Sequence, residues 1–235
     1  MAKTQNNYRR VRLLIGTLGM LLPVILPIFH GYVNSFTGGE YEVWLRSISH
    51  YNYSYASVIF TGVLMSFGLL LMSYKGYPDG TFWVRDDTVT SLSGALAIVV
   101  ALIPTLYDNT LMSTPNAHDK NYLSLIHLIS AGAFLILLGV MSAHKFTMGR
   151  SQDVYHVRRR RAYRTLGYTT ILSILTLAVL FALKLTNGNT VFIFEAIALF
   201  AFGFAWLLKG KAAFFVALGL ITRDELIKAR SGDEE

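Results

Sequence analysis

Long apolar runs separated by short polar connections make up most of the chain. Six of these runs have the length of a bilayer-spanning helix, about 17–25 mostly apolar residues. They cover roughly residues 12–33, 55–75, 88–107, 122–144, 165–185 and 190–208. The pattern predicts an all-α polytopic membrane protein, a six-transmembrane-helix bundle that occupies residues 1–211.

The two ends of the chain differ from this pattern. The first run follows a basic stretch but is longer than the apolar part of a signal peptide and lacks a cleavage motif, so we expect a retained helix. Residues 212–235 contain an apolar stretch of about ten residues, which is too short to span a bilayer. This stretch predicts a short interfacial helix, and the acidic residues after it predict a disordered tail.

Composition and charge fit this interpretation. The chain is 53% hydrophobic and only 15% charged, whereas soluble domains carry about 25% charged residues. If the N-terminus is inside, 18 of the 21 Lys and Arg residues lie in inner segments. The positive-inside rule therefore predicts a multi-pass protein of the cell (inner) membrane with both termini cytoplasmic. The net charge of +7 then follows from topology, and no nucleic-acid partner is expected.

Two further features bear on partners and chemistry. Arg158, Arg159, Arg160 and Arg161 form a basic run at an inner helix end, where we expect contact with anionic lipid headgroups. A homo-oligomer is left open. The chain contains no cysteine, which excludes disulfides, thiol catalysis and cysteine metal sites.

Ionisable residues gather in the predicted outer third of the bilayer, and an intramembrane charge is costly enough to mark a functional site. They are His30, His50, Asp108, His127 and Glu195. A zinc ion could be held by His50, His127, Asp108 and His30, because zinc takes imidazole and carboxylate ligands. Ser49, Tyr51 and Glu195 are then the candidate catalytic residues. The alternative is a hydrogen bond between His127 and Glu195 that fixes helix packing.

Three functions remain open at this point. The first is a metal-dependent lipid hydrolase or lipid-remodelling protein, in which zinc would activate water against an ester or amide. The second is an ion channel or proton-coupled transporter, with His127 and Glu195 as the relay. The third is a non-enzymatic membrane sensor or assembly subunit that binds a ligand or partner through the outer loop at 34–54.

Several motifs resemble an uncharacterised bacterial family of multi-pass membrane proteins. They are SISHYNYS, F60-T61-G62, SYKGY at 73–77, the acids at 86–87, GALAIVVALIPT at 94–105 and HLISAGAF at 127–134. The resemblance implies that Ser49, His50, Tyr51, Asp87 and His127 belong to a shared pattern. An Arg-Asp pair that opens the second helix in that family is replaced here by Ser57 and Val58. A more distant similarity is to intramembrane hydrolases of the alkaline ceramidase and adiponectin-receptor type.

Overall fold

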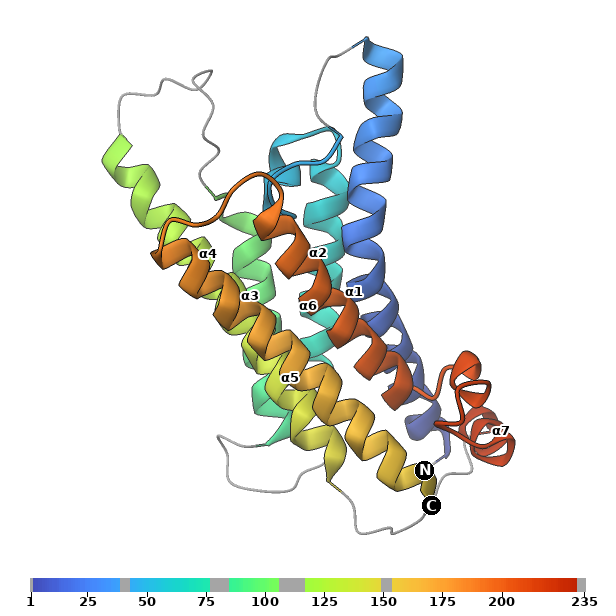
Figure 1. The fold of residues 1–235 in the computed structure, drawn as a ribbon. Helices are drawn as coiled ribbons and strands as arrows, with labels where there is room; N and C mark the ends of the chain where they lie inside the picture. The colour runs from blue at the N-terminus through green and yellow to red at the C-terminus, as the bar shows by residue number, and fades with distance from the viewer. Residues whose placement is uncertain (1, 39–42, 77–84, 106–116, 149–153, 232–235) are drawn as a thin grey trace.

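The computed structural model describes residues 2–38, 43–76, 85–105, 117–148 and 154–231 (Figure 1). Every regular element in these ranges is helical. The long helices are α1 (Ala2–Thr37), α4 (Ala117–Ala143), α5 (Val154–Ala182) and α6 (Thr190–Lys209), and the shorter ones are α2 (Ser57–Met72), α3 (Asp86–Leu102) and α7 (Arg223–Ser231). Short 3₁₀ turns are η1 (Ser49–Tyr53), η3 (Lys145–Thr147) and η4 (Ala213–Val216).

Four apolar helical segments are long enough to cross a membrane. They are Tyr8–Thr37, Tyr122–Thr147, Val154–Ala182 and Thr190–Lys209. The other two predicted spans correspond to α2, with 16 residues, and α3, with 17. At 1.5 Å per residue these helices are about 24–26 Å long, shorter than the roughly 30 Å hydrocarbon core. The structure thus supports an all-helical membrane protein, while the count of six spans and the cytoplasmic location of the termini stay predictions.

Apolar side chains cover the outer surface of the bundle. Val58 is 80% exposed, Ile129 62% and Leu172 60%. Exposure of such apolar side chains to water is unfavourable, whereas their contact with lipid tails is not. The exposed faces are therefore those expected of an integral membrane protein.

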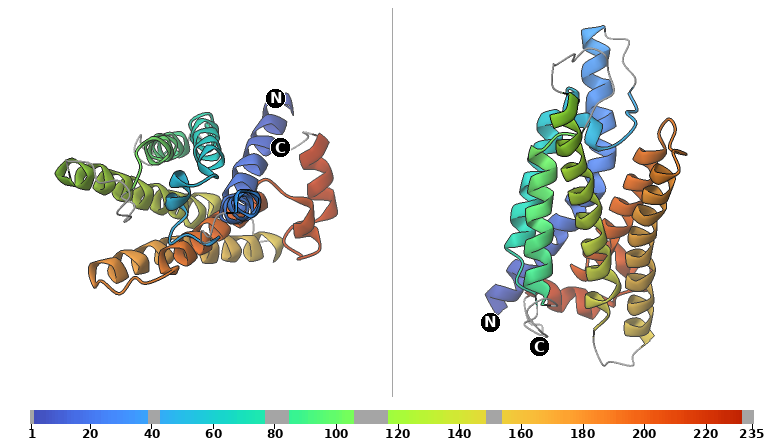
Figure 2. Two further views of the ribbon diagram at one scale, coloured as in Figure 1. Left: turned by 90° about the horizontal axis from the view of Figure 1, so that it is seen from above. Right: turned by 90° about the vertical axis from the view of Figure 1, so that its left-hand side faces the viewer.

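The bundle is built from three tightly apposed helix pairs, α1 with α6, α2 with α3, and α4 with α5 (Figure 2). Each pair approaches through one glycine on either helix, and a methyl group added to either glycine would crowd the other's carbonyl oxygen. The glycine pairs are Gly16 with Gly203, Gly68 with Gly94, and Gly139 with Gly167. Small residues allow this approach because helix association in lipid depends on van der Waals contact between backbones.

Polar groups concentrate at the two ends of the bundle. The first end carries η1 and the surrounding residues 43–54, which we call the cap segment; it lies at the top of Figure 1. The opposite end carries the start of α1, the end of α6 and helix α7, and we call it the basic end. Between them the core is mostly apolar and includes Leu26, Phe67 and Phe202, with a few buried hydroxyl groups such as that of Thr170.

The arginine run at the start of α5 divides between two environments. Arg158 and Arg161 are exposed, so their predicted contact with lipid headgroups stays a prediction. Arg159 is buried, and its guanidinium lies 2.6 Å from the carboxylate of Glu225 in α7. One member of the run therefore contacts the C-terminal helix of its own chain.

Candidate functional site at the cap end

The cap segment is folded on itself around Tyr51. The phenol of Tyr51 donates to the carbonyl of Val43 (2.8 Å) and accepts from the N–H of Leu45 (3.2 Å). Burial raises the pKa of Tyr51 above its usual 10, although the Leu45 N–H partly offsets the effect. The phenol thus remains protonated at physiological pH and keeps its role as donor.

His127 joins the cap segment to helices α3 and α4. It lies in α4, and its Nδ1 is 2.5 Å from the backbone carbonyl of Ile103, next to the end of α3. Its Nε2 is 2.9 Å from Oγ of Ser49 in η1. Because a carbonyl can only accept, Nδ1 must carry the proton, and in the neutral ring Nε2 is then an acceptor for the Ser49 hydroxyl.

Glu195 joins the same segment to helix α6. Its Oε2 accepts a hydrogen bond of 2.7 Å from the backbone N–H of Ile48. One turn earlier in α6, the N–H of Phe192 donates to the carbonyl of Arg46 (2.9 Å). The Glu195 oxygen therefore satisfies a backbone donor that would be costly to bury without an acceptor.

Two ionisable side chains therefore hold two consecutive residues of the cap segment. Glu195 binds Ile48 and His127 binds Ser49, from different helices. In the described structure the two side chains do not hydrogen-bond each other. The direct His127–Glu195 pair considered from the sequence is replaced by an arrangement in which the cap segment lies between them.

The proposed metal ligands are placed differently. The ring of His30 in α1 packs edge-on against Tyr51, with centroids 5.9 Å apart, and the backbone N–H of His50 donates to Ser47 Oγ (3.1 Å). Asp108 lies outside the described residues. Within the part of the chain that the structure describes, no three His, Asp or Glu side chains gather as a metal would require. Zinc binding stays a prediction.

Sequence reasoning missed the backbone groups of this site. The Ile103 carbonyl and the Ile48 N–H have no side-chain signature. Pro104 signals that α3 ends nearby, which leaves the last carbonyls of the helix without helical partners, but it does not reveal which donor meets them. A further bond, from Tyr53 Oη to the Thr105 carbonyl (2.5 Å), fastens the cap segment to the same stretch.

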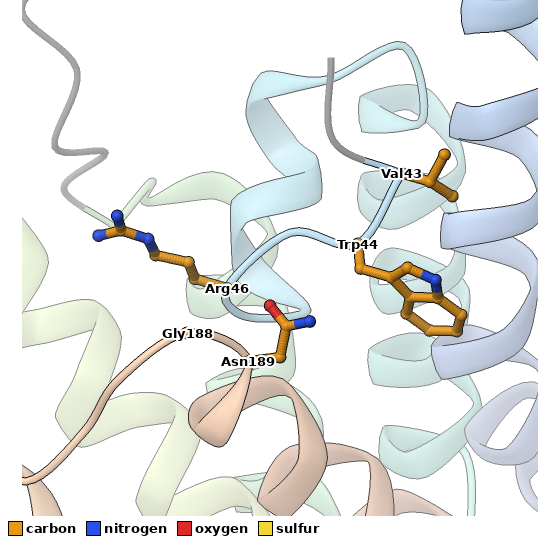
Figure 3. A pocket seen from close by; sticks show the side chains of 5 residues that line it. All are labelled: Val43, Trp44, Arg46, Gly188 and Asn189. Atoms are coloured by element: carbon orange, nitrogen blue, oxygen red, sulfur yellow. The ribbon is translucent and has the colours of Figure 1, made fainter. Parts of the chain in front are cut away.

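An open hollow of about 490 Å³ lies beside the cap segment (Figure 3). It is lined by Val43, Trp44, Arg46, Gly188 and Asn189. The side chains of Trp44 and Arg46 are exposed, so an indole face and a guanidinium are both available to a molecule from outside. The two side chains point to opposite sides of the hollow (Figure 3), and the guanidinium is the group that suits a negatively charged molecule.

Comparisons of the chain with protein-family models, with curated proteins and with solved structures find no match. The resemblances drawn from its motifs therefore stay predictions.

Proposed function

We propose that the protein is a membrane-embedded serine hydrolase that cleaves lipid-type esters at the cap end of the bundle. The observation that carries the proposal is the relay from Ser49 Oγ through His127 to the Ile103 carbonyl, with separations of 2.9 and 2.5 Å. A nucleophile bonded to a base, with the base oriented by a third group, is the recurrent arrangement of covalent catalysis.

The chemistry follows from these positions. Ser49 Oγ attacks the acyl carbon and its proton passes to Nε2 of His127, which then protonates the leaving alcohol. Water, deprotonated by the same nitrogen, releases the acid and restores Ser49. The Ile103 carbonyl holds the required tautomer, as the aspartate does in a catalytic triad, but it lacks the negative charge that stabilises the imidazolium.

The burial of the Ser49–His127 pair and the position of Arg46 indicate which class of ester the site could accept. Ser49 and His127 are 8% and 2% exposed, respectively, which keeps bulk water away from the pair. The hollow that contains Arg46 begins three residues from Ser49 in the chain. An ester with an anionic headgroup would match Arg46, while its acyl chain would lie against the exposed apolar helices.

A fluorophosphonate probe tests the proposal because it modifies only serines that are activated as nucleophiles. We expect labelling of Ser49 in the bilayer-reconstituted protein, its loss in Ser49→Ala, and a fall of about 100-fold in His127→Gln. Ser47→Ala is the matched control, since Ser47 is equally buried and two residues away; it should label normally. An unlabelled wild-type protein, or labelling that survives in Ser49→Ala, would reject the hydrolase.

A metal-dependent hydrolase can be distinguished by elemental mass spectrometry. Zinc would compete with Ser49 and Ile103 for the ring nitrogens of His127. About one zinc per chain, lost in His127→Ala, would favour metal-activated water. Absence of zinc with retained labelling would favour the serine mechanism.

The hollow supports a second candidate, a non-enzymatic sensor of an amphiphilic anion. Three of its lining residues, Val43, Trp44 and Arg46, belong to the segment that Glu195 and Phe192 fasten to α6, so a bound molecule would act on that helix through this segment. A sensor predicts ligand-induced stabilisation that depends on Arg46 and persists in Ser49→Ala. A hydrolase predicts turnover that Ser49→Ala abolishes.

A further inference from the structure

The basic end gathers charged side chains from separate elements. Lys145 in η3 lies 3.4 Å from the carboxylate of Asp86 in α3, and both side chains are less than a tenth exposed. Arg159 in α5 lies 2.6 Å from Glu225 in α7. These two ion pairs bring together parts of the chain that are far apart in sequence.

Three more basic residues join this group. Arg12, Asp86, Arg159 and Lys211 all lie near enough to act electrostatically on Lys209, at the end of α6. Among the residues that the structure describes, the group holds five basic side chains and two carboxylates. The positive charges of these side chains attract an anion more strongly where water is scarce than they would in bulk water.

Two of these cations, Arg12 and Lys209, lie against aromatic rings. Arg12 Nε donates to the phenol of Tyr74 (3.2 Å), and Lys209 Nζ lies 5.2 Å from the ring centre of Phe146. The indole of Trp206 packs edge-on against both rings, with centroids 5.2 Å apart in each case. Trp206 is therefore in contact with the two rings on which Arg12 and Lys209 rest.

The Trp206 indole provides an independent sign of a ligand. Its Nε1–H is fully buried and has no acceptor among the described residues. An indole nitrogen is a donor only, and buried donors in proteins nearly always meet an acceptor. An oxygen-bearing anion would satisfy this donor, and two cations lie over the rings that Trp206 contacts.

The backbone after α6 is also unusual. Lys211 has a φ of +52°, a conformation that side chains other than glycine's rarely adopt and that costs free energy. It follows Gly210 and returns the chain toward η4, so two lysines flank a sharp turn at the end of a helix. Strain of this kind is commonly retained where a side chain must take a defined position.

We propose that the basic end binds a phosphate group through Lys209, Lys211 and the indole N–H of Trp206. A tetrahedral phosphate offers several acceptor oxygens and up to two negative charges, which a single carboxylate does not. The end of a membrane-crossing helix is the depth of a lipid headgroup, so an anionic phospholipid is one source of the phosphate and a free phosphate ion is the other. This site is at the opposite end of the bundle from Ser49 and does not depend on the hydrolase.

Native mass spectrometry of the full chain in detergent tests the proposal, with phosphatidic acid, phosphatidylcholine and inorganic phosphate as probes. We expect one phosphatidic acid to be retained in preference to phosphatidylcholine. Trp206→Phe keeps the ring and removes the donor, and Lys209→Gln removes one charge; each should weaken retention about tenfold. Arg164→Gln removes the same charge from an exposed position outside the run Arg158 to Arg161 and should retain the lipid as the wild type does.

The outcomes distinguish a phospholipid from free phosphate as the ligand, and a specific site from general attraction to positive charge. Displacement by inorganic phosphate, with the same dependence on Trp206 and Lys209, would identify free phosphate as the ligand. Equal weakening by Lys209→Gln and Arg164→Gln would mean general attraction to a basic surface and would overturn the site. If Lys209→Gln does not fold, Trp206→Phe decides: unchanged retention of both phosphatidic acid and phosphate in that variant overturns the proposal.

Discussion

The backbone N–H of Ile48 donates to Oε2 of Glu195 over 2.7 Å, across 147 positions of the chain. The carboxylate thereby fastens the cap segment to α6, while His127 fastens the adjacent residue to α4. Ionisable side chains near the membrane are costly to bury, and here the Glu195 carboxyl group and the neutral His127 ring each bind a backbone or hydroxyl group of the cap segment.

Removing the Glu195 carboxylate should loosen the cap segment. Glu195→Ala leaves the Ile48 N–H without an acceptor, and we expect a loss of about 1.5–3 kcal/mol of unfolding free energy. Glu195→Gln keeps a carbonyl acceptor and should lose less. Thermal unfolding in detergent measures both, with the exposed Asn189→Ala as a control on the same helix end. Equal stability of Glu195→Ala and the wild type would show that this bond does not fasten the segment.

Ser49 and His127 should be energetically coupled. Both atoms of the bond are buried, so a double-mutant cycle with Ser49→Ala and His127→Ala should give a coupling energy of about 0.5–3 kcal/mol. The equilibrium measurement is unfolding by denaturant in micelles. Strictly additive losses would mean that the 2.9 Å contact does not persist in solution, and the serine hydrolase would lose its basis.

The positions of the long helices could be predicted from the sequence, whereas the contacts of the site residues could not. Helices α1, α4, α5 and α6 follow the apolar runs within several residues, apart from polar extensions at their first ends, because transfer into lipid dominates their energetics. Residue type and position along the chain indicate Ser49, His127 and Glu195 as candidate site residues. Their contacts were not predictable, since they depend on how the cap segment folds back and on the backbone groups of Ile48 and Ile103.

The arginine run shows the same limit at the basic end. Arg158 and Arg159 are identical in type and adjacent, yet one is exposed and the other is buried against Glu225. Successive residues of a helix point about 100° apart, so the difference depends on where α7 packs. A charge pattern alone cannot supply that position.

Glycine substitutions should separate close packing from helix propensity. A Cβ at Gly68 would lie 2.7–2.8 Å from Ile98 and from the carbonyl of Gly94, whereas one at Gly62 in the same helix meets nothing within 4 Å. We expect Gly68→Ala to destabilise the protein by about 1–3 kcal/mol and Gly62→Ala to be neutral or stabilising by up to about 1 kcal/mol. Melting temperatures of the two variants test this, and equal effects would contradict the proposed close approach of α2 and α3.

Adjacent aspartates should respond very differently to neutralisation. Asp86 is paired with the buried Lys145, so Asp86→Asn leaves an uncompensated buried cation and should cost about 3–5 kcal/mol. Asp87 pairs with Arg85 near the surface, where such pairs contribute about 0–1 kcal/mol. Chemical denaturation of Asp86→Asn, Asp87→Asn and the double variant Asp86→Asn/Lys145→Met measures the contrast. The double variant should recover much of the loss, and failure to recover would argue against the ion pair as the cause.

The attachment of α7 should depend on pH through Glu225. Burial by itself would raise the pKa of Glu225, but the Thr222 N–H and the Arg159 guanidinium outweigh it and hold the pKa below its usual 4.5. A carboxyl with a lowered folded-state pKa contributes stability that is fully present above about pH 4.5 and is lost as the pH falls through the folded-state value.

Hydrogen exchange of residues 213–231, corrected for intrinsic rates, should therefore show protection that decreases below pH 4.5. Glu225→Gln should show lower protection with little pH dependence, and the exposed neighbour variant Asp224→Asn should follow the wild type. If protection in Glu225→Gln decreased below pH 4.5 as it does in the wild type, another acidic group would be responsible for the pH dependence.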